Sequence, residues 1–235
     1  DQKTNGKKGC AVIGYGGMGG WHTRHLLESD VAYLTGIYDI KPERAELARE
    51  NGIYAYPWYE AVLADPKVDF VTIAVPNELH APLAIQALRA GMHVISEKPV
   101  TLSVNELDSV IKVADECGKL FTVHQNRRFD VDFLAMKQIY NSGEIGDIFN
   151  IESRIHGSRG IPSDWRGIKQ YGGGMLYDWG IHLIDQVMQI LTAPVTKIDC
   201  RFDHITNEEV DDGFRLDMTF ADGKTAYVEV GTYNF

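Results

Sequence analysis

A short apolar run leads directly into a glycine-rich turn in residues 10–19, which read Cys10-Ala11-Val12-Ile13-Gly14-Tyr15-Gly16-Gly17-Met18-Gly19. An apolar run that ends in a turn signal is typical of a buried strand. The glycines follow the pattern G-x-G-x-x-G, and the next residues favour a helix over 18–29. Because a strand precedes the pattern and a helix follows it, the stretch predicts a βα unit that binds the pyrophosphate of a dinucleotide.

Each glycine of this turn has a separate predicted task. Gly14 permits the tight turn, Gly16 lets backbone N–H groups approach the pyrophosphate, and Gly19 lets the helix pack closely on the strand. The helix N-terminus adds partial positive charge for the phosphates. The predicted cofactor-binding loop therefore comprises Gly14, Tyr15, Gly16, Gly17, Met18 and Gly19.

The second strand, expected over 32–38, ends at Asp39. A carboxylate at this place accepts hydrogen bonds from the adenosine ribose and repels a 2′-phosphate, which favours NAD as the cofactor, with NADP as the second choice. The alternative is that Asp39 only caps the next helix, which Pro42 would open.

Strands and helices alternate through the first half of the chain. We expect strands at 10–14, 32–38, 69–75, 93–96 and 120–124, and helices at 18–29, 42–51, 81–90 and 104–117. Such alternation implies parallel strands with helices on both faces. Residues 1–124 are therefore predicted to form an α/β domain, a doubly wound parallel sheet of the Rossmann type.

The pattern changes after about residue 125. We expect helices at 132–141 and 175–191, and strands at 147–156, 214–220 and 224–233, with a hairpin at Asp222-Gly223. Residues 125–235 then form an α+β substrate and oligomerisation domain with a mainly antiparallel, open sheet. Since the chain stops at a strand, we expect this domain to be truncated and the protein to form a homo-oligomer, a dimer or a tetramer.

Composition excludes several classes of protein. The formal net charge of −10 argues against nucleic-acid binding, and no apolar run is long enough to span a membrane. The three cysteines are scattered, which predicts neither a disulfide framework nor a metal site. These features, with an opening that lacks a signal peptide, predict a cytoplasmic enzyme with a small-molecule substrate.

Lys98 follows the strand at 93–96, at the carboxyl edge of the predicted sheet, where open α/β sheets bind ligands. Pro99 restricts the backbone of Lys98 to extended conformations. Oxidation of an alcohol requires that the hydroxyl loses its proton, and a desolvated lysine beside the nicotinamide ring could hold that hydroxyl and lower its pKa. The alternative is an ordinary surface lysine.

Asp178 and His182 lie four residues apart in the helix expected over 175–191 and therefore share a face. A histidine beside an aspartate can accept the substrate proton while the carboxylate orients hydroxyl groups. The alternative for an isolated helical histidine is a structural role in the core.

Several motifs occur in an order that resembles the Gfo/Idh/MocA oxidoreductases, the group of glucose–fructose oxidoreductase and inositol 2-dehydrogenase. The motifs are the loop at 14–19 with Asp39, AVPN at 74–77 with His80, AGMHV at 90–94 running into EKP at 97–99, GEIG at 143–146, DWR at 164–166 and GGGMLYDWGIH at 172–182. The resemblance covers nearly the whole chain. It implies that Lys98 is catalytic, that His182 is the acid/base and that Asp178 binds the substrate.

Other positions complete the predicted site. The residues expected to contact the cofactor, beyond the loop and Asp39, are Ala74, Pro76, Asn77, His80, Glu97 and Lys98. Glu97 is expected to hold a cofactor ribose or to position Lys98. The substrate candidates are Arg128, Trp165 and Arg166, where packing of the tryptophan is an equal alternative. Other histidines, among them His22 and His124, are left as structural or surface residues.

The leading hypothesis is a dehydrogenase or reductase that acts on a secondary hydroxyl of a sugar, cyclitol or related polyol. One alternative is an NAD-dependent glycosidase, as in some relatives, which recycles its cofactor. Another is a dinucleotide-sensing regulatory protein on the same fold. Net NADH production separates the dehydrogenase from the glycosidase, and the presence of Lys98, Asp178 and His182 argues against the sensor.

Overall fold

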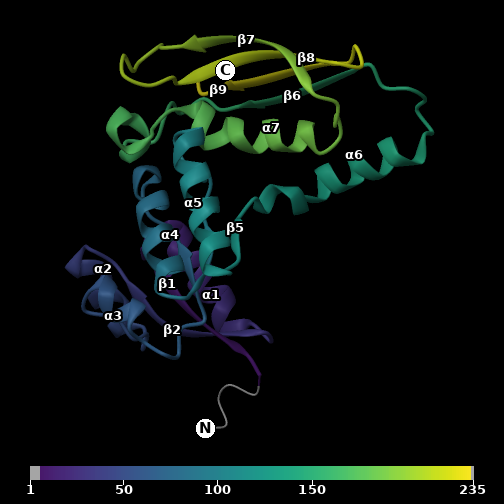
Figure 1. Cartoon of the computed structure of the whole chain (residues 1–235). Coiled ribbons are helices and arrows are strands. Elements are labelled where there is room, and N and C mark those ends of the chain that lie inside the picture. Colours follow the sequence, from purple (N-terminus) through teal and green to yellow (C-terminus); the bar gives the residue numbers. More distant parts are fainter. Residues whose placement is uncertain (1–5, 234–235) are drawn as a thin grey trace. The chain divides into compact units, whose positions relative to one another are not determined.

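The computed structural model describes residues 6–233, and the chain divides between His124 and Gln125 into two compact units (Figure 1). Over this described range, no helix has both the length and the apolar character needed to cross a membrane. The thiols of Cys10, Cys117 and Cys200 are free. Each unit is built around its own sheet.

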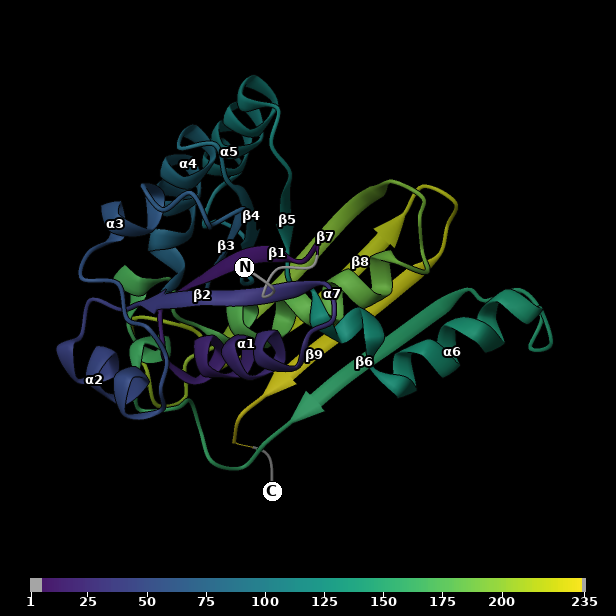
Figure 2. The same ribbon diagram turned by 90° about the horizontal axis from the view of Figure 1, so that it is seen from below.

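The first unit contains a parallel sheet of five strands in the order β2-β1-β3-β4-β5 (Figure 2). The strands are β1 (Lys8–Ile13), β2 (Ala32–Tyr38), β3 (Phe70–Ile73), β4 (His93–Ser96) and β5 (Phe121–Val123). The strand order reverses between β1 and β3, which is the switch point at which such sheets bind ligands. The predicted doubly wound parallel sheet is confirmed.

Helices cover both faces of this sheet because successive side chains of its central strand point to opposite sides. Ala11 and Ile13 of β1 belong to one buried cluster, and Val12 belongs to another. The helices are α1 (Gly17–Glu28), α2 (Pro42–Glu50), α3 (Tyr59–Leu63), α4 (His80–Arg89) and α5 (Val104–Cys117). Figure 2 shows α1 and α2 on one side of the strands and α4 and α5 on the other.

Local signals set the helix ends. Pro42 occupies the first turn of α2, where its missing N–H costs nothing. At the start of α5, the Ser103 hydroxyl accepts from the Glu106 N–H, and the Glu106 carboxylate accepts from the Leu102 N–H. This reciprocal pair is close to a capping box, and it explains why the predicted bounds of α5 match the observed ones.

The second unit contains four strands in the order β6-β9-β8-β7. The strands are β6 (Asn150–His156), β7 (Val195–Asp203), β8 (Gly213–Phe220) and β9 (Thr225–Gly231). Among the strands described for the second unit, only β6 and β9 pair in parallel, so the predicted mainly antiparallel sheet is confirmed. The hairpin at Asp222-Gly223 joins β8 to β9, and Gly223 has φ +83° there.

One strand and one helix of the second unit differ from prediction. No strand was predicted over β7, because its sequence shows little apolar alternation. The strand lies at the edge of the sheet, and its side chains are mostly exposed. The single helix predicted over 175–191 is wrong in its first part. The chain there forms a π-helical turn, Leu176–Gly180, before α7 (Ile181–Met188).

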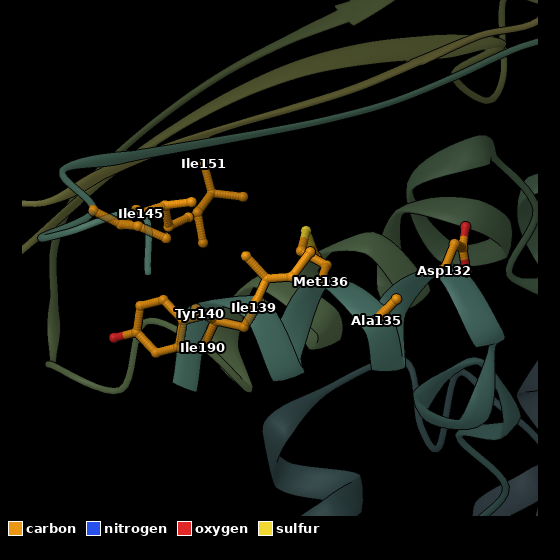
Figure 3. A pocket seen from close by; sticks show the side chains of 9 residues that line it. Asp132, Ala135, Met136, Ile139, Tyr140, Ile145, Ile151 and Ile190 are labelled. Atoms are coloured by element: carbon orange, nitrogen blue, oxygen red, sulfur yellow. The ribbon is translucent and has the colours of Figure 1, made fainter. Parts of the chain in front are cut away.

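The core of the second unit lies between one face of the sheet and its helices α6 (Val131–Ser142) and α7. Phe214 and Phe220 of β8 are its largest fully buried side chains. Beside this core, α6 and the chain leading to β6 border an apolar pocket of about 310 Å³ (Figure 3). None of the predicted site residues lines that pocket, so the candidate site lies elsewhere.

Candidate active site

The glycine-rich loop has the shape of an open cradle. Gly14 has φ +89°, and a Cβ at Gly14 would lie 2.3 Å from the Ala74 carbonyl oxygen. A Cβ at Gly19 would lie 1.8 Å from the Gly14 carbonyl oxygen, so only glycine lets α1 pack this closely. Gly16 and Gly17 have open space where a Cβ would stand. The backbone N–H groups of the first turn of α1 can therefore be approached closely by a phosphate.

Asp39 ties this loop to the end of β2. One carboxylate oxygen accepts from the Tyr15 N–H at 2.7 Å, and the other accepts from the Lys41 N–H at 2.9 Å. Lys41, the N-cap residue of α2, offers no side-chain cap of its own, so Asp39 also binds the backbone at the start of this helix. A pocket of about 470 Å³ opens beside Asp39 and is bordered by Pro42 and Tyr56. The cradle, the carboxylate and the pocket together fit the adenosine and pyrophosphate parts of a dinucleotide.

The segment after β3 carries the predicted residues Ala74, Pro76, Asn77 and His80. Asn77 and His80 are buried. The His80 ring lies between two carbonyl oxygens, with Nδ1 2.7 Å from Pro99 O and Nε2 3.0 Å from Val75 O. Burial lowers the pKa of His80, against the opposing effect of the two carbonyls. His80 therefore links this segment to the EKP turn, and its contact with a cofactor stays a prediction.

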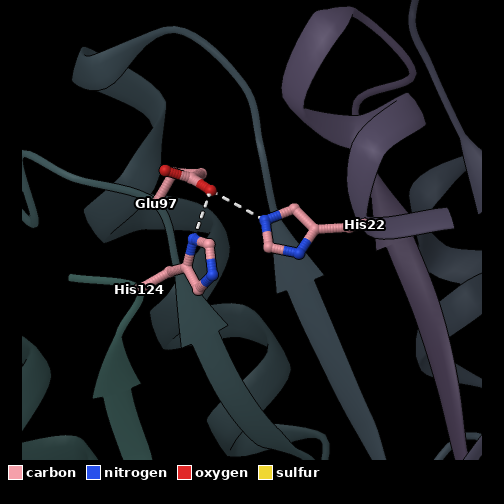
Figure 4. A group of neighbouring side chains, drawn as sticks. All are labelled: His22, Glu97 and His124. Atoms are coloured by element: carbon pink, nitrogen blue, oxygen red, sulfur yellow. Dashed lines mark hydrogen bonds and ion pairs between the residues drawn. The ribbon is translucent and has the colours of Figure 1, made fainter. Parts of the chain in front are cut away.

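Glu97 is a buried carboxylate with three donors around it (Figure 4). Its Oε1 lies 2.7 Å from His22 Nε2 and 2.9 Å from His124 Nδ1, and its Oε2 accepts from the Lys98 N–H at 3.3 Å. Burial alone would raise the pKa of Glu97, but the hydrogen bonds from His124 and His22 outweigh it and lower the pKa to about 2. These donors favour the ionised form of Glu97, whose second oxygen contacts the Lys98 backbone N–H.

His22 and His124 are not among the predicted site residues. The donor atoms of these histidines and a Glu97 oxygen lie within 4.8 Å of one another, a spacing that a metal ion could also bridge. No local spacing indicates this cluster, because its members come from α1, from the turn after β4 and from the end of β5. Only the parallel pairing of β4 with β5 and the placement of α1 bring them together.

In the second unit, the predicted residues Trp165, Arg166 and Asp178 are close together. Arg166 donates through Nε to the Asp178 carboxylate at 3.0 Å and through Nη1 to Asp164 at 2.7 Å. Its guanidinium also lies over the Trp165 ring, 4.6 Å from the centroid. Asp178 is therefore held by a charged hydrogen bond, and Trp165 stacks on an arginine within the same cluster.

His182 is buried near the start of α7, with 6% of its surface exposed. Its ring meets Trp179 edge to face at 6.0 Å between centroids, and the guanidinium of Arg127 lies 4.3 Å from the centre of the Trp179 ring. Asp178 and Trp179 lie on the π-helical turn, a widened turn that is frequent at functional sites.

Arg128, a substrate candidate, has its guanidinium paired with Asp185 of α7. Nε donates to one carboxylate oxygen at 2.7 Å and Nη2 to the other at 2.5 Å. The hydrogen bond from this carboxylate raises the pKa of Arg128 above its usual range. Arg128 thus fixes the segment before α6 against α7, and contact with a substrate stays a prediction.

The π-helical turn is anchored by Asp211. Its carboxylate accepts from the Leu176 N–H at 2.9 Å, and its carbonyl accepts from the Met175 N–H at 3.1 Å. Gly174 has φ +108°, and a Cβ there would lie 2.3 Å from an Asp211 carboxylate oxygen. Asp211 therefore caps the helical segment that carries Asp178 and His182, provided that residue 174 is glycine.

We expect Gly174→Ala to destabilise the second unit by about 2 kcal/mol, because alanine is strained at this φ and would displace the Asp211 cap. Thermal unfolding followed by circular dichroism measures the effect. Gly157→Ala is the matched control, since Gly157 is exposed and has open space around it. Equal unfolding temperatures for the two variants would contradict the role of Gly174.

The parallel sheet and its glycine cradle define the class of oxidoreductases with an NAD-binding Rossmann domain. The chain belongs to the Gfo/Idh/MocA family of that class. The family described as "Oxidoreductase family, NAD-binding Rossmann fold" matches residues 8–125, and the Gfo/Idh/MocA C-terminal domain matches residues 133–234. The family resemblance stated from the motifs is therefore confirmed.

Individual relatives agree with this assignment. The chain is 32% identical over 212 residues to the scyllo-inositol 2-dehydrogenase (NADP(+)) IolW of Bacillus subtilis, covering 89% of this chain and 59% of the relative. It is 34% identical over 193 residues to the scyllo-inositol 2-dehydrogenase (NAD(+)) of the same organism, covering 80% and 55%. A crystal structure of an NAD-binding protein from Listeria innocua superposes with a TM-score of 0.95 at 47% identity, covering 97% of this chain and 68% of the other. The chain thus spans little more than half of the length of these two curated relatives.

Proposed function

We propose that the protein carrying this sequence is a dehydrogenase or reductase that transfers a hydride between a nicotinamide dinucleotide and a secondary hydroxyl or ketone of a sugar, cyclitol or polyol. The observation that carries the proposal is the position of Lys98. It follows β4 at the carboxyl edge of the sheet that bears the glycine cradle, and its backbone N–H is bound by buried Glu97. The two inositol dehydrogenases among the relatives support this substrate class.

The bound nicotinamide supplies the hydride acceptor or donor, and residues of the chain supply orientation and proton transfer. Lys98, partly buried, would hold the reacting oxygen and stabilise its deprotonated form. His182 would accept or return the hydroxyl proton, a task suited to imidazole near neutral pH. Asp178, itself oriented by Arg166, would accept hydrogen bonds from substrate hydroxyls.

Net reduction of NAD⁺ is the direct test. NADH absorbance is followed with the whole protein, NAD⁺ and a panel of inositols, aldoses and linear polyols, beside a matched NADP⁺ series. We expect absorbance to grow with at least one of these substrates. Binding of NAD⁺ without any net reduction across the panel would overturn the dehydrogenase proposal and favour the glycosidase or the sensor.

Asp39 is proposed to select NAD over NADP, because its carboxylate repels a 2′-phosphate. The curated relatives include an NADP(+)-dependent and an NAD(+)-dependent enzyme. The cofactor preference of this chain therefore has to be inferred from its own residues. We expect Asp39→Ser to raise the ratio of NADP⁺ to NAD⁺ affinity at least ~10-fold, because the substitution removes the negative charge that repels the 2′-phosphate. Fluorescence titration with both dinucleotides measures the ratio.

Loss of the Tyr15 contact in Asp39→Ser weakens both dinucleotides alike, and for this reason the ratio is the quantity to compare. Asp30→Ser, at an exposed position before β2, is the control for a change in net charge alone. An unchanged ratio in Asp39→Ser would remove Asp39 from the basis of cofactor choice.

A further inference from the structure

We propose that His22 and His124 are positioning residues. They act through Glu97 to hold the backbone of Lys98 in a fixed position relative to α1, the helix that follows the dinucleotide loop. This inference rests on the proposed function of Lys98. It assigns a task to two histidines that lie outside every sequence motif of the predicted site and that contact Glu97.

One carboxylate, that of Glu97, joins three segments of the first unit. His22 stands on α1, three residues after Gly19, while His124 directly follows β5. Both rings approach the same oxygen, Oε1 of Glu97, and the other oxygen faces the Lys98 N–H. A displacement of α1 or of the end of β5 is thereby transmitted to the backbone at Lys98.

The three side chains of this cluster are largely buried. The side chains of Glu97 and His22 are 8% and 10% exposed, and that of His124 is 22% exposed. A buried ionised carboxylate is stable only when strong hydrogen-bond donors offset its loss of hydration. Loss of either imidazole leaves the negative charge of Glu97 with too few donors. Movement of the Glu97 side chain relieves this imbalance and also releases the Lys98 N–H.

The hydrogen bonds to Glu97 also define which histidine nitrogens carry protons. An ionised carboxylate only accepts hydrogen bonds, so His22 must carry a proton on Nε2 and His124 must carry one on Nδ1. The two distances, 2.7 and 2.9 Å, are those of charge-assisted hydrogen bonds. A metal ion would require the same two nitrogens without protons, so the protonation of these atoms separates the two interpretations.

Substitutions can retain or remove a donor at each of these atoms. His22→Gln keeps an N–H near the position of Nε2, and His124→Asn keeps one near the position of Nδ1. His22→Leu and His124→Leu fill similar space without a donor. We expect each leucine variant to lower kcat at least ~10-fold, because small misplacements of a reacting group are costly, while KM for NAD⁺ changes less than about threefold.

The amide variants are expected to keep kcat within about threefold of the original protein, which a space-filling role would not predict. Because both histidines act through one oxygen, the double leucine variant should lose less than the product of the two single effects. Wild-type kcat in both leucine variants, or an equal fall in the amide and leucine variants, would overturn the proposal.

A second measurement does not depend on turnover. Long-range ¹H–¹⁵N NMR spectra of the protein without cofactor report which ring nitrogen of each histidine carries a proton. We expect protonated Nε2 at His22 and protonated Nδ1 at His124, and the same spectra with one equivalent of Zn²⁺ should be unchanged. The opposite tautomers, or stoichiometric Zn²⁺ binding that His22→Gln abolishes, would overturn the proposal. These spectra test the hydrogen bonds to Glu97 even if the leucine variants do not fold. They also test them if no polyol substrate is turned over.

Discussion

Lys98→Ala is expected to lower turnover at least ~100-fold with little change in the affinity for NAD⁺, because the substitution removes proton-transfer assistance and leaves the dinucleotide cradle in place. The cradle is formed by the backbone at 14–19 and by Asp39, and the substitution changes neither of them. Steady-state kinetics with the substrate found in the NADH assay measure turnover, and fluorescence titration measures NAD⁺ affinity.

Lys112→Ala is the matched control for Lys98→Ala. Lys112 lies on α5 of the same unit, is 75% exposed and pairs only loosely with Glu116 at 3.8 Å. Lys98→Arg is a second comparison, since it keeps the positive charge but donates with a different geometry and a higher pKa. Unchanged turnover in Lys98→Ala would show that the lysine takes no part in the reaction.

His182→Ala is the second substitution with a large expected effect, again at least ~100-fold in turnover, because a general acid/base is lost. Since His182 is buried, alanine also leaves space beside Trp179, and a part of the loss could come from displacement of α7. His182→Gln fills most of this space and cannot accept and return a proton at neutral pH. We therefore expect the glutamine variant to be as inactive as the alanine variant.

His156→Ala is the control within the same unit. His156 lies on β6, where its ring pairs with Glu229 at 3.4 Å, and it belongs to no predicted site. The unfolding temperature of each variant separates lost chemistry from lost structure. Restored turnover in His182→Gln would identify His182 as a packing residue and would transfer the acid/base role to another group.

A pattern within a few residues was sufficient to predict much of this protein. The turn at 14–19 could be interpreted because a buried strand precedes it and a helix follows it, and both are local properties. The hairpin at Asp222-Gly223 and the bounds of α5 were predicted for the same reason. The family assignment added a fold for each half, and the observed sheets agree with it.

Patterns failed where the environment of a segment determines its structure. The strand β7 was not predicted, since an edge strand with exposed side chains needs no apolar alternation. The π-helical turn at Leu176–Gly180 was predicted as ordinary α-helix, because the features that shape it come from elsewhere in the chain. These are the Asp211 cap and Phe214, whose ring would lie 2.7 Å from a Cβ at Gly180.

The sequence by itself determined the order of the elements, the dinucleotide loop and the identity of the candidate catalytic side chains Lys98, Asp178 and His182. Only the tertiary structure decided what surrounds these residues. Glu97, next to Lys98, is bound by His22 and His124, and Asp178 is oriented by Arg166. Hydrogen bonds of this kind join residues far apart in the chain, so their geometry depends on the packing of whole strands and helices and has no local signature.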